Sequence, residues 1–582
     1  MPDPTHARIA YFSMEIALEN SIPTYSGGLG VLAGDMLRSA ADLELPMVGV
    51  TLAYRKGYFE QSLDAQGQQS ESPSAWEPEK VVEPAGAGVT VKIEGRPVKV
   101  RAWRYKVTGL GGRFVPVYLL DTALPENDPQ DQVLTDRLYG GDRRYRLCQE
   151  VILGMGGMRL LRALGYVRLE SYHMNEGHSA FLTVALLEEQ LRDHQNDPGS
   201  LEDEIGRLRQ KCIFTTHTPV PAGHDVFERS LVTQVIGQKR ADGIAASGLM
   251  PNGQLNMTEL ALYCSHYVNG VAMRHGEISR SMFPRFSIRA ITNGVHVGTW
   301  TAPSFQDLYD RQVPEWRQDN RYLRYAMGIS LEEIRQAHAA AKRRLFEAIL
   351  QETGVTLDES NLTLGFARRA AVYKRADLLL SDPGRLEELV RTAGPLQIVY
   401  AGKAHPADEE GKALIRRVFE SSARLRGGIR LLYIQNYDMH WGQLLTSGVD
   451  LWLNTPLRPY EASGTSGMKA ALNGVPSLSV LDGWWIEGHG EGVTGWSIGD
   501  DLARDGSSAE TDSLYEKLEE VIVPQFYQRP LAYAGVMRGA IAFNGSFFNT
   551  QRMLRQYVEN AYSLRVLGQD EIEESELRWK VG

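Results

Sequence analysis

The segment Glu461-Ala-Ser-Gly-Thr-Ser-Gly-Met-Lys469-Ala-Ala-Leu-Asn473 follows a short apolar run at 449–453 and leads into helix-forming residues. A strand that passes through a turn of small residues into a helix is the repeating unit of a parallel α/β sheet. Small residues before a helix also let backbone N–H groups approach an anion, which the helix N-terminus favours. The segment therefore predicts an α/β domain. An anion site at this turn and a plain strand–helix connection both remain open.

A lysine in this segment narrows the choice of anion. Lys469 lies one turn into the predicted helix, from which its amine can reach back over a bound group. A loop that grips phosphate, next to a primary amine that can form an imine, is what pyridoxal 5'-phosphate requires. We therefore interpret the segment as a candidate site for that cofactor.

Short apolar runs rich in β-branched residues alternate with helical stretches on both sides of this segment. Strands are predicted in the first half of the chain at 9–14, 47–53, 115–121 and 212–216. Strands are predicted in the second half at 362–366, 396–401, 429–434, 449–453 and 476–480. The pattern predicts two α/β domains whose loops face one another across a cleft.

The domain boundaries are predicted at 1–297, 298–550 and 551–582. The first domain holds a polar segment, 70–84, and two alternating runs, 89–93 and 98–107, which together predict an inserted β-ribbon. In the second domain a helix is predicted at 331–352, capped by Ser330 and Glu333 and stopped by Gly354. The last unit is predicted to be a helix at 551–564, followed by a solvated acidic tail at 570–576.

Composition excludes several classes of protein. A chain of 582 residues is too long for one hydrophobic core, and a net charge of -10 argues against a nucleic-acid partner. The sequence has no apolar run that could cross a membrane and no signal-peptide pattern, so we expect a cytoplasmic enzyme. The three cysteines have no metal-ligand spacing and are predicted to be buried thiols. We expect no metal.

A basic cluster follows the predicted strand 362–366. Arg368, Arg369, Lys374 and Arg375 gather positive charge where the sheet edge opens, and arginine and lysine both suit phosphate oxygens. The Gly-rich stretch 25–30, which also enters a helix, is consistent with the other wall of an anion site. The residues show no serine triad, and spacing alone picks out no pair of glycosidase carboxylates.

The segment 461–469 resembles the cofactor-lysine motif of the glycogen and maltodextrin phosphorylases, Glu-Ala-Ser-Gly-Thr-x-x-Met-Lys. The similarity continues through 26–30, 215–219, 265–272, 292–295, 373–375, 402–404 and 481–483, and spans most of 9–564. The resemblance implies two Rossmann-like doubly wound domains around a deep cleft. It also implies a pyridoxal-phosphate-dependent glycosyltransferase, an α-glucan phosphorylase that uses inorganic phosphate to release glucose 1-phosphate with retention. A homodimer is the assembly that it suggests.

The resemblance also implies a role for individual residues. Lys469 would hold the cofactor as a Schiff base, and Arg369 would hold the substrate phosphate. The cofactor would be surrounded by Gly28, Thr465, Ser466, Arg368 and Lys374, with Tyr437 and Trp300 nearby. The transferred glucosyl unit would contact Glu461, Ser463, Gly464, Asn293 and His217. In the family, the phosphate of the cofactor donates and accepts the proton, which explains the missing pair of carboxylates.

Several positions depart from the animal and plant enzymes of this family. Asp438 stands where those enzymes carry arginine, Ala371-Val372 replaces His-Glu, and Ser466-Gly467 replaces Gly-Asn. The first predicted strand begins at Ile9, without the long control segment that precedes it in those enzymes. The pattern is similar to the short microbial branch, so allosteric control is not expected. The preferred glucan stays open.

Two other functions compete with this interpretation. A retaining glycosyltransferase of the glycogen synthase type shares the architecture, but it carries a Glu-Pro-x-Gly-Leu motif without the lysine, so Lys469 favours a phosphorylase. A non-catalytic glucan-binding protein could use aromatic residues such as Trp484 and Tyr460, but it would have little use for Lys469 together with Arg369 and Lys374.

Overall fold

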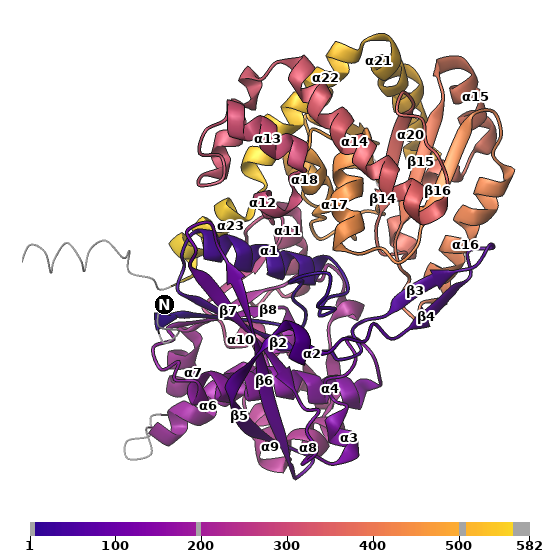
Figure 1. Ribbon diagram of the computed structural model, residues 1–582. Coiled ribbons are helices and arrows are strands. Elements are labelled where there is room, and N and C mark those ends of the chain that lie inside the picture. The colour runs from indigo at the N-terminus through magenta and orange to yellow at the C-terminus, as the bar shows by residue number, and fades with distance from the viewer. Residues whose placement is uncertain (1–5, 194–199, 500–507, 563–582) are drawn as a thin grey trace, which may run out of the picture.

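The computed structural model describes residues 6–193, 200–499 and 508–562. These residues form two lobes, each built on its own sheet (Figure 1). The predicted acidic tail at 570–576 lies outside the described residues.

The first lobe is built on a nine-stranded sheet with the order β13-β12-β9-β8-β1-β2-β7-β6-β5. The seven strands from β13 to β7 are parallel, and they follow a doubly wound order whose switch point lies between β1 and β8. The strands are β1 (Ile9–Ser13), β2 (Met47–Leu52), β5 (Glu83–Ile93), β6 (Arg96–Thr108), β7 (Phe114–Asp121), β8 (Ser171–Asn175), β9 (Cys212–Thr215), β12 (Tyr267–Gly270) and β13 (Arg289–Ala290).

The second lobe is built on a six-stranded, all-parallel sheet with the order β16-β15-β14-β17-β18-β19. This is the classic doubly wound order, with its switch point between β14 and β17. The strands are β14 (Leu362–Ala367), β15 (Leu396–Ala401), β16 (Ile429–Ile434), β17 (Leu451–Asn454), β18 (Ser477–Val480) and β19 (Gly495–Ile498). The predicted α/β class with two Rossmann-like sheets is confirmed.

Most of the predicted elements are present. Strands β15 and β16 have the predicted bounds, and helix α14 (Leu331–Thr353) begins at its Ser330 cap and ends at Gly354, which has a φ of +69°. The late helix is α23 (Thr550–Asn560), so it ends earlier than predicted. The short strands β8, β12, β13 and β19 were not predicted.

The predicted β-ribbon is a hairpin, but it is not an insertion apart from the sheet. Strands β5 and β6 pair antiparallel, and β6 pairs with β7, so the hairpin extends the main sheet by two strands. The physical reason is that β7 would otherwise be an open edge, and its backbone groups need partners. Part of the polar segment in front of this hairpin belongs to a second hairpin, β3 (Glu60–Leu63) and β4 (Gln69–Ser72), which sequence reasoning missed.

The β3–β4 hairpin reaches from the first lobe to the second, where it lies near α16 (Glu409–Arg424) (Figure 1). The Gln61 amide donates to the Gly402 carbonyl over 3.0 Å, and its oxygen accepts from the Asn436 N–H over 2.9 Å. The Gln69 amide makes a matching pair with the backbone of Ala404, at 2.9 and 3.0 Å. Both glutamines are buried, so the hairpin joins the two lobes through satisfied polar contacts.

The hydrophobic cores show where the chain changes lobes. Ile291 packs in a core of the first lobe, whereas Val295 and Val297 pack in the main core of the second. Helix α23 returns to the first lobe and packs on α1 (Gly28–Asp42), as the yellow and indigo helices of Figure 1 show. The helix predicted as a separate C-terminal unit is therefore part of the packing of the first lobe. The predicted division into domains otherwise stays a prediction.

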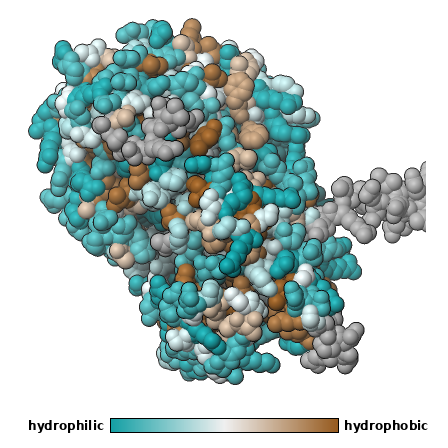
Figure 2. Space-filling model, turned by 180° about the vertical axis from the view of Figure 1, so that it is seen from behind, coloured by the Kyte–Doolittle hydropathy of each residue, from teal (hydrophilic) through white to brown (hydrophobic). Residues whose placement is uncertain are grey.

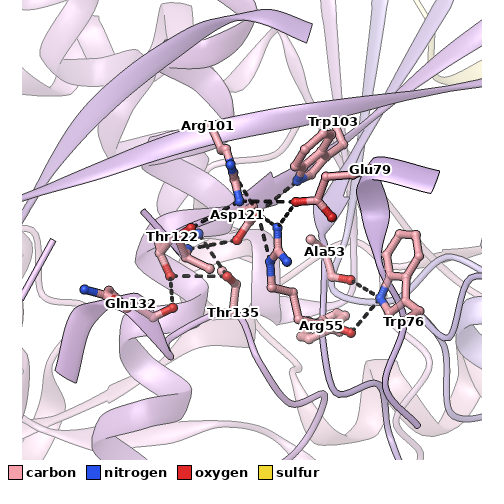
Figure 3. Close-up of polar contacts among 12 residues, drawn as sticks. Ala53, Arg55, Trp76, Glu79, Arg101, Trp103, Asp121, Thr122, Gln132 and Thr135 are labelled. Carbon is pink, nitrogen blue, oxygen red and sulfur yellow. Dashed lines mark hydrogen bonds and ion pairs between the residues drawn. The ribbon is translucent and has the colours of Figure 1, made fainter. Parts of the chain in front are cut away.

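A buried carboxylate fixes the edge of the first sheet (Figure 3). Asp121 at the end of β7 accepts hydrogen bonds from Arg55, Arg101 and the Trp103 indole over 2.9–3.1 Å. Burial alone would raise the pKa of Asp121, but the hydrogen bonds from Arg55 and Trp103 lower it below its ordinary value. The antiparallel strand β6 is thereby tied to the segment that leads into β3.

The surface is mainly polar on the face seen in Figure 2, where apolar residues form only scattered patches. Among the described residues, no helix is both long and apolar enough to span a bilayer. The three cysteines are buried free thiols, as predicted. Within the same part of the chain, no cluster of three histidine, cysteine or acidic side chains could hold a metal ion.

Candidate active site

The candidate residues lie after the carboxyl ends of parallel strands in both lobes. Arg368 and Arg369 follow β14, and Glu461 lies in the loop after β17, so both positions flank the switch point of the second sheet. In the first lobe, Gly28 begins α1 after β1, and His217 follows β9. Ligands of open α/β sheets bind at such crevices.

Glu461 lies between two cations. Its Oε2 atom accepts from Arg368 Nη2 and Lys374 Nζ, each at 2.5 Å, and all three side chains are at least nine-tenths buried. Burial alone would raise the pKa of Glu461, but the positive charges of Arg368 and Lys374 outweigh it and lower the pKa to about 2. Burial and the charge of Arg368 lower the pKa of Lys374. The cluster carries one more positive charge than negative and can accept an anion.

Buried polar atoms around this cluster have unused hydrogen-bonding capacity. Arg368 Nη1, Ser463 Oγ and Asn454 Oδ1 are buried and have no hydrogen-bond partner within the described ranges. Leaving such atoms unpaired costs about 1–3 kcal/mol each. A polar ligand with acceptor oxygens would satisfy the guanidinium and the hydroxyl, so the surroundings suit a phosphate ester.

Lys469 lies in the short helix α18 (Ser466–Ala471). Its Nζ atom is 3.7 Å from the centre of the Trp300 ring, and the amine makes no hydrogen bond or ion pair within the described part of the chain. Chiefly because it is buried, the pKa of Lys469 falls to about 8. The Trp300 indole donates to Asp35 over 2.7 Å, which holds the ring against the amine. The lysine is therefore a buried amine that loses its proton more readily than an ordinary lysine and can serve as a nucleophile.

Three of the other residues predicted for the cofactor lie near Lys469: Trp300 packs on its amine, and Thr465 and Ser466 precede it at the start of α18. Ser466 accepts from the Trp452 indole over 3.0 Å, and Thr465 precedes α18. A Cβ atom on Gly442 would lie 3.0 Å from the Tyr437 hydroxyl and 3.4 Å from Trp300, so these two rings border the same place. In the first lobe, a Cβ added to Gly28 would meet no atom within 4 Å. Two cations, a free amine and open space at Gly28 fit the predicted pyridoxal phosphate.

Arg369 points to a different place from Arg368. Its side chain is exposed, and Nη2 donates to the Tyr373 hydroxyl over 3.2 Å. It lines a cavity of about 460 Å³, whose other walls are Ala371, Val372, Tyr373, His405, Asp408, Glu410 and Leu457. Tyr58 of the first lobe lies 6.2 Å from His405, centroid to centroid, so the lobes meet at this cavity. A second anion could enter here.

The candidate residues of the first lobe are held by their own network. His217 Nε2 lies 2.6 Å from Asn175 Oδ1, and burial lowers the pKa of His217 to about 3, so this imidazole is neutral. Asn293 follows β13 and is buried. Among the described residues, no hydrogen bond joins Gly28, His217 or Asn293 to the Glu461 cluster. Their shared role at one ligand stays a prediction.

Sequence reasoning missed three carboxylates beside the candidate residues. Glu15 accepts from the backbone of Ser26 over 2.6 Å in the Gly-rich loop, and burial raises its pKa. Glu176, a non-glycine residue with a φ of +74°, accepts from the His217 N–H over 2.7 Å. Asp482 accepts from the Glu461 N–H over 2.9 Å, and burial raises its pKa to about 6. Glu15 and Asp482 each follow a predicted strand, and Asp482 also lies in the family-like stretch 481–483, whereas Glu176 follows β8, which was not predicted.

Gly402 offers a test of how the loop that carries Arg368 and Arg369 is held in place. It has a φ of +146°, and a Cβ atom there would lie 1.8 Å from the Arg368 carbonyl oxygen. We expect Gly402→Ala to displace Arg368 and to lower the free energy of unfolding by more than the ~1–3 kcal/mol of backbone strain alone. Urea unfolding against Gly86→Ala checks this, because Gly86 has a φ of +78° and open space around it. Equal losses in the two variants would contradict the expectation.

Comparison with known proteins places the chain among phosphorylases. A family model described as carbohydrate phosphorylase matches residues 14–109 and 224–492, which include every candidate residue except His217. A maltodextrin phosphorylase from Thermococcus litoralis is 38% identical, and the alignment covers 95% of this chain and 70% of the relative. Glycogen phosphorylases from Mycobacterium bovis and Aquifex aeolicus are 38% and 34% identical. Those alignments cover 95% of this chain, and 70% and 86% of the respective relatives.

Proposed function

The chain belongs to the carbohydrate phosphorylase family and acts as an α-glucan phosphorylase, and from this premise we propose how its residues divide the work. The terminal glucosyl residue of an α-1,4-glucan passes reversibly to inorganic phosphate, with retention, and leaves as glucose 1-phosphate. This proposal rests on one observation. The site has a buried amine at Lys469 that no described residue engages, and two arginines, Arg368 and Arg369, whose side chains lie in different places.

We propose that pyridoxal 5'-phosphate is the resident cofactor. Lys469 would hold it covalently, Trp300 and Tyr437 would border it, and Arg368, Lys374 and the turn at Thr465–Ser466 would bind its phosphate, with Gly28 leaving room on the opposite side. When bound, the cofactor supplies a phosphate group that can donate and accept a proton. Glu461 would share its two cations with that phosphate, which keeps the total charge of the site near neutral.

The substrate phosphate would enter at the cavity beside Arg369. A guanidinium offers several donors in one plane and suits a phosphate that must be held in a fixed orientation. Lys374 carries charge between the two anion positions, because it is paired with Glu461 on the buried side and stacks 4.5 Å from Tyr373 of the cavity wall. These cations would stabilise negative charge as it moves between two phosphates during glucosyl transfer.

The glucosyl residue would lie between the lobes. The buried Ser463 hydroxyl has no hydrogen-bond partner among the described residues, and Gly464, with a φ of +75°, lies next to the Glu461 carboxylate. From the first lobe, Asn293 and the neutral His217 would contact sugar hydroxyls. A neutral imidazole has one donor and one acceptor nitrogen, both suited to sugar hydroxyls, and the lowered pKa of His217 keeps the ring neutral.

The direct test of this function is phosphorolysis. The purified chain, supplied with pyridoxal phosphate, should release glucose 1-phosphate from maltooligosaccharides or glycogen only when inorganic phosphate is present. The same assay, run on short maltooligosaccharides against glycogen, identifies the preferred glucan. Release of free glucose without phosphate would mean hydrolysis. Extension of the glucan from a nucleotide sugar, with release of the nucleoside diphosphate, would mean a synthase. Either result overturns the proposal.

The shifted pKa of Lys469 predicts the pH dependence of cofactor loading. Only the neutral amine attacks a carbonyl, and lowering the pKa from 10.5 to about 8 leaves about one tenth of the amine neutral at pH 7. We expect the rate at which the cofactor-free protein takes up pyridoxal phosphate to rise with pH and to level off above about pH 8. Absorbance of the bound cofactor follows the reaction. A rate that keeps rising towards pH 10 would show an ordinary lysine.

A further inference from the structure

The turn at Thr292–Val295 is held mainly by a distant part of the chain, residues 547–552, which we call the C-terminal strap. Val295 N–H donates to the Phe548 carbonyl over 3.1 Å, and Thr550 N–H donates back to Val295 over 3.0 Å. A Cβ atom on Gly294 would lie 2.2 Å from the backbone of Asn549. The strap therefore lies directly against the turn that carries Asn293.

Arg552, the last residue of the strap, reaches both carbonyls around Asn293. Its Nη1 atom donates to the Thr292 carbonyl over 2.6 Å, and Nη2 donates to the Asn293 carbonyl over 2.9 Å. Its Nε atom donates back to the Phe547 carbonyl of the strap over 2.9 Å. The planar guanidinium fork thus fixes two successive peptide groups relative to the strap, which a single-point contact could not do.

The second lobe holds the turn from the other side. Thr292 Oγ1 donates to Glu487 over 2.7 Å, and the other oxygen of Glu487 accepts from the Met273 N–H over 2.9 Å. Glu487 lies in α19 (Trp485–Gly488), which follows β18 of the second sheet. The turn is therefore clamped between the two lobes, while no described residue hydrogen-bonds the side-chain amide of Asn293. That amide is free to meet a ligand.

Burying the charged side chain of Arg552 costs free energy, so packing alone does not explain why an arginine stands at this position. Arg552 is 9% exposed, and within the described ranges its polar partners are three carbonyl oxygens and the Gln556 amide, with no ion pair. Burial lowers its pKa to about 10, so it still carries its charge at neutral pH. Glu487 attracts this charge without contacting it, and a buried charge that forms no direct ion pair destabilises a fold relative to an apolar side chain of similar size. What the buried guanidinium provides is a fixed geometry for the turn at Thr292–Val295.

We propose that Arg552 is a positioning residue for the glucosyl site: it fixes the peptide groups of Thr292 and Asn293, so that the Asn293 amide faces the sugar. The C-terminal strap then contributes to the active site and is not a purely structural segment. This inference rests on the proposed function, because it takes Asn293 as a contact of the transferred glucosyl unit.

Replacing Arg552 by methionine removes the fork but keeps most of the buried volume. For Arg552→Met we expect kcat/KM for maltooligosaccharides to fall roughly 10- to 100-fold, as for the loss of charged hydrogen bonds. The KM for phosphate and the absorbance of the bound cofactor should stay unchanged, and thermal stability should stay equal or rise. For Arg552→Lys, whose amine can reach only one carbonyl, kcat/KM should lie between the values of the wild type and of Arg552→Met.

The matched control is Arg555→Met on the same helix. Arg555 is 35% exposed and pairs only loosely with Asp319, at 3.6 Å, so its loss should leave the kinetics unchanged. Arg552→Met with wild-type glucan kinetics would overturn the inference. So would a parallel loss of stability, cofactor and both substrates, because that pattern marks a purely structural arginine. If the methionine variant fails to fold, Arg552→Lys carries the same test.

A binding measurement separates this inference from the proposed function. Calorimetric titration of the wild type and of Arg552→Met with maltotetraose, without phosphate, needs no turnover. Weaker binding by the variant supports the positioning role whatever reaction follows, and equal binding contradicts it. Failure of the wild type to release glucose 1-phosphate would instead defeat the proposed function.

Discussion

Lys469→Ala should abolish phosphorolysis and remove the near-ultraviolet or visible absorbance of the bound cofactor. The physical reason is that Lys469 places a buried amine of lowered pKa against Trp300, where it can attack a carbonyl. A missing amine cannot be replaced by a neighbouring water, and alanine removes the covalent attachment altogether. Activity assays and absorbance spectra of the same preparation check both losses.

Lys403 provides a matched control for this experiment. Burial also lowers its pKa to about 8, yet its amine donates to the Phe59 carbonyl over 3.1 Å and packs against the Phe59 ring. We expect Lys403→Ala to keep the covalent cofactor, because this amine is already engaged between the lobes. Cofactor that remains attached in Lys469→Ala but is lost in Lys403→Ala would show that the wrong lysine had been chosen.

Arg369→Ala should weaken the use of phosphate far more than it weakens retention of the cofactor. Arg369 lines the cavity, whereas Arg368 is buried against Glu461, so the two neighbours serve different anions in our proposal. Loss of one charged contact typically costs ~1.5–3 kcal/mol, which is roughly 10- to 100-fold in affinity. The KM for phosphate and the cofactor content after dialysis measure the two effects separately.

The neighbouring residue Arg368 provides the control for Arg369→Ala. Arg368→Ala should release the cofactor and leave Glu461 paired with Lys374 alone. If Arg369→Ala loses cofactor and phosphate affinity to the same extent, the two anion positions are not distinct and the assignment of Arg369 is wrong.

The sequence predicts the second sheet better than the first. Strands 396–401 and 429–434 are runs with a single polar residue each, Gln397 and Arg430, and their bounds agree with the structure. Strand β8 contains serine, histidine and asparagine, and its burial pattern is set by neighbours on both sides, so periodicity could not reveal it. The β5–β6 hairpin was visible as alternation, but its attachment to β7 depends on an edge that only the folded sheet defines.

The candidate site was predictable where short motifs carry it. Lys469 and Arg368 could be proposed from segments of a few residues, because phosphate chemistry restricts which side chains can serve, whereas Glu461 was implied only by the family resemblance. The pairing of Glu461 with Arg368 joins positions 93 residues apart, and no local pattern encodes such a contact. Glu15 and Arg552 were missed for the same reason, since each acts on backbone groups and leaves no motif.

The packing of α23 on α1 also bears on how the chain folds during synthesis. Every strand of the first sheet has been made once residue 290 leaves the ribosome. One of its cores, however, still lacks Met553, Leu554 and Tyr557, which pack with Ile9 and Tyr11 of the first strand. Contacts between the two ends of a chain form late, and until then the apolar face that they cover is open to aggregation. This core of the first lobe is therefore completed only after Tyr557 has been made, and a chaperone that binds the open apolar face would act during that interval.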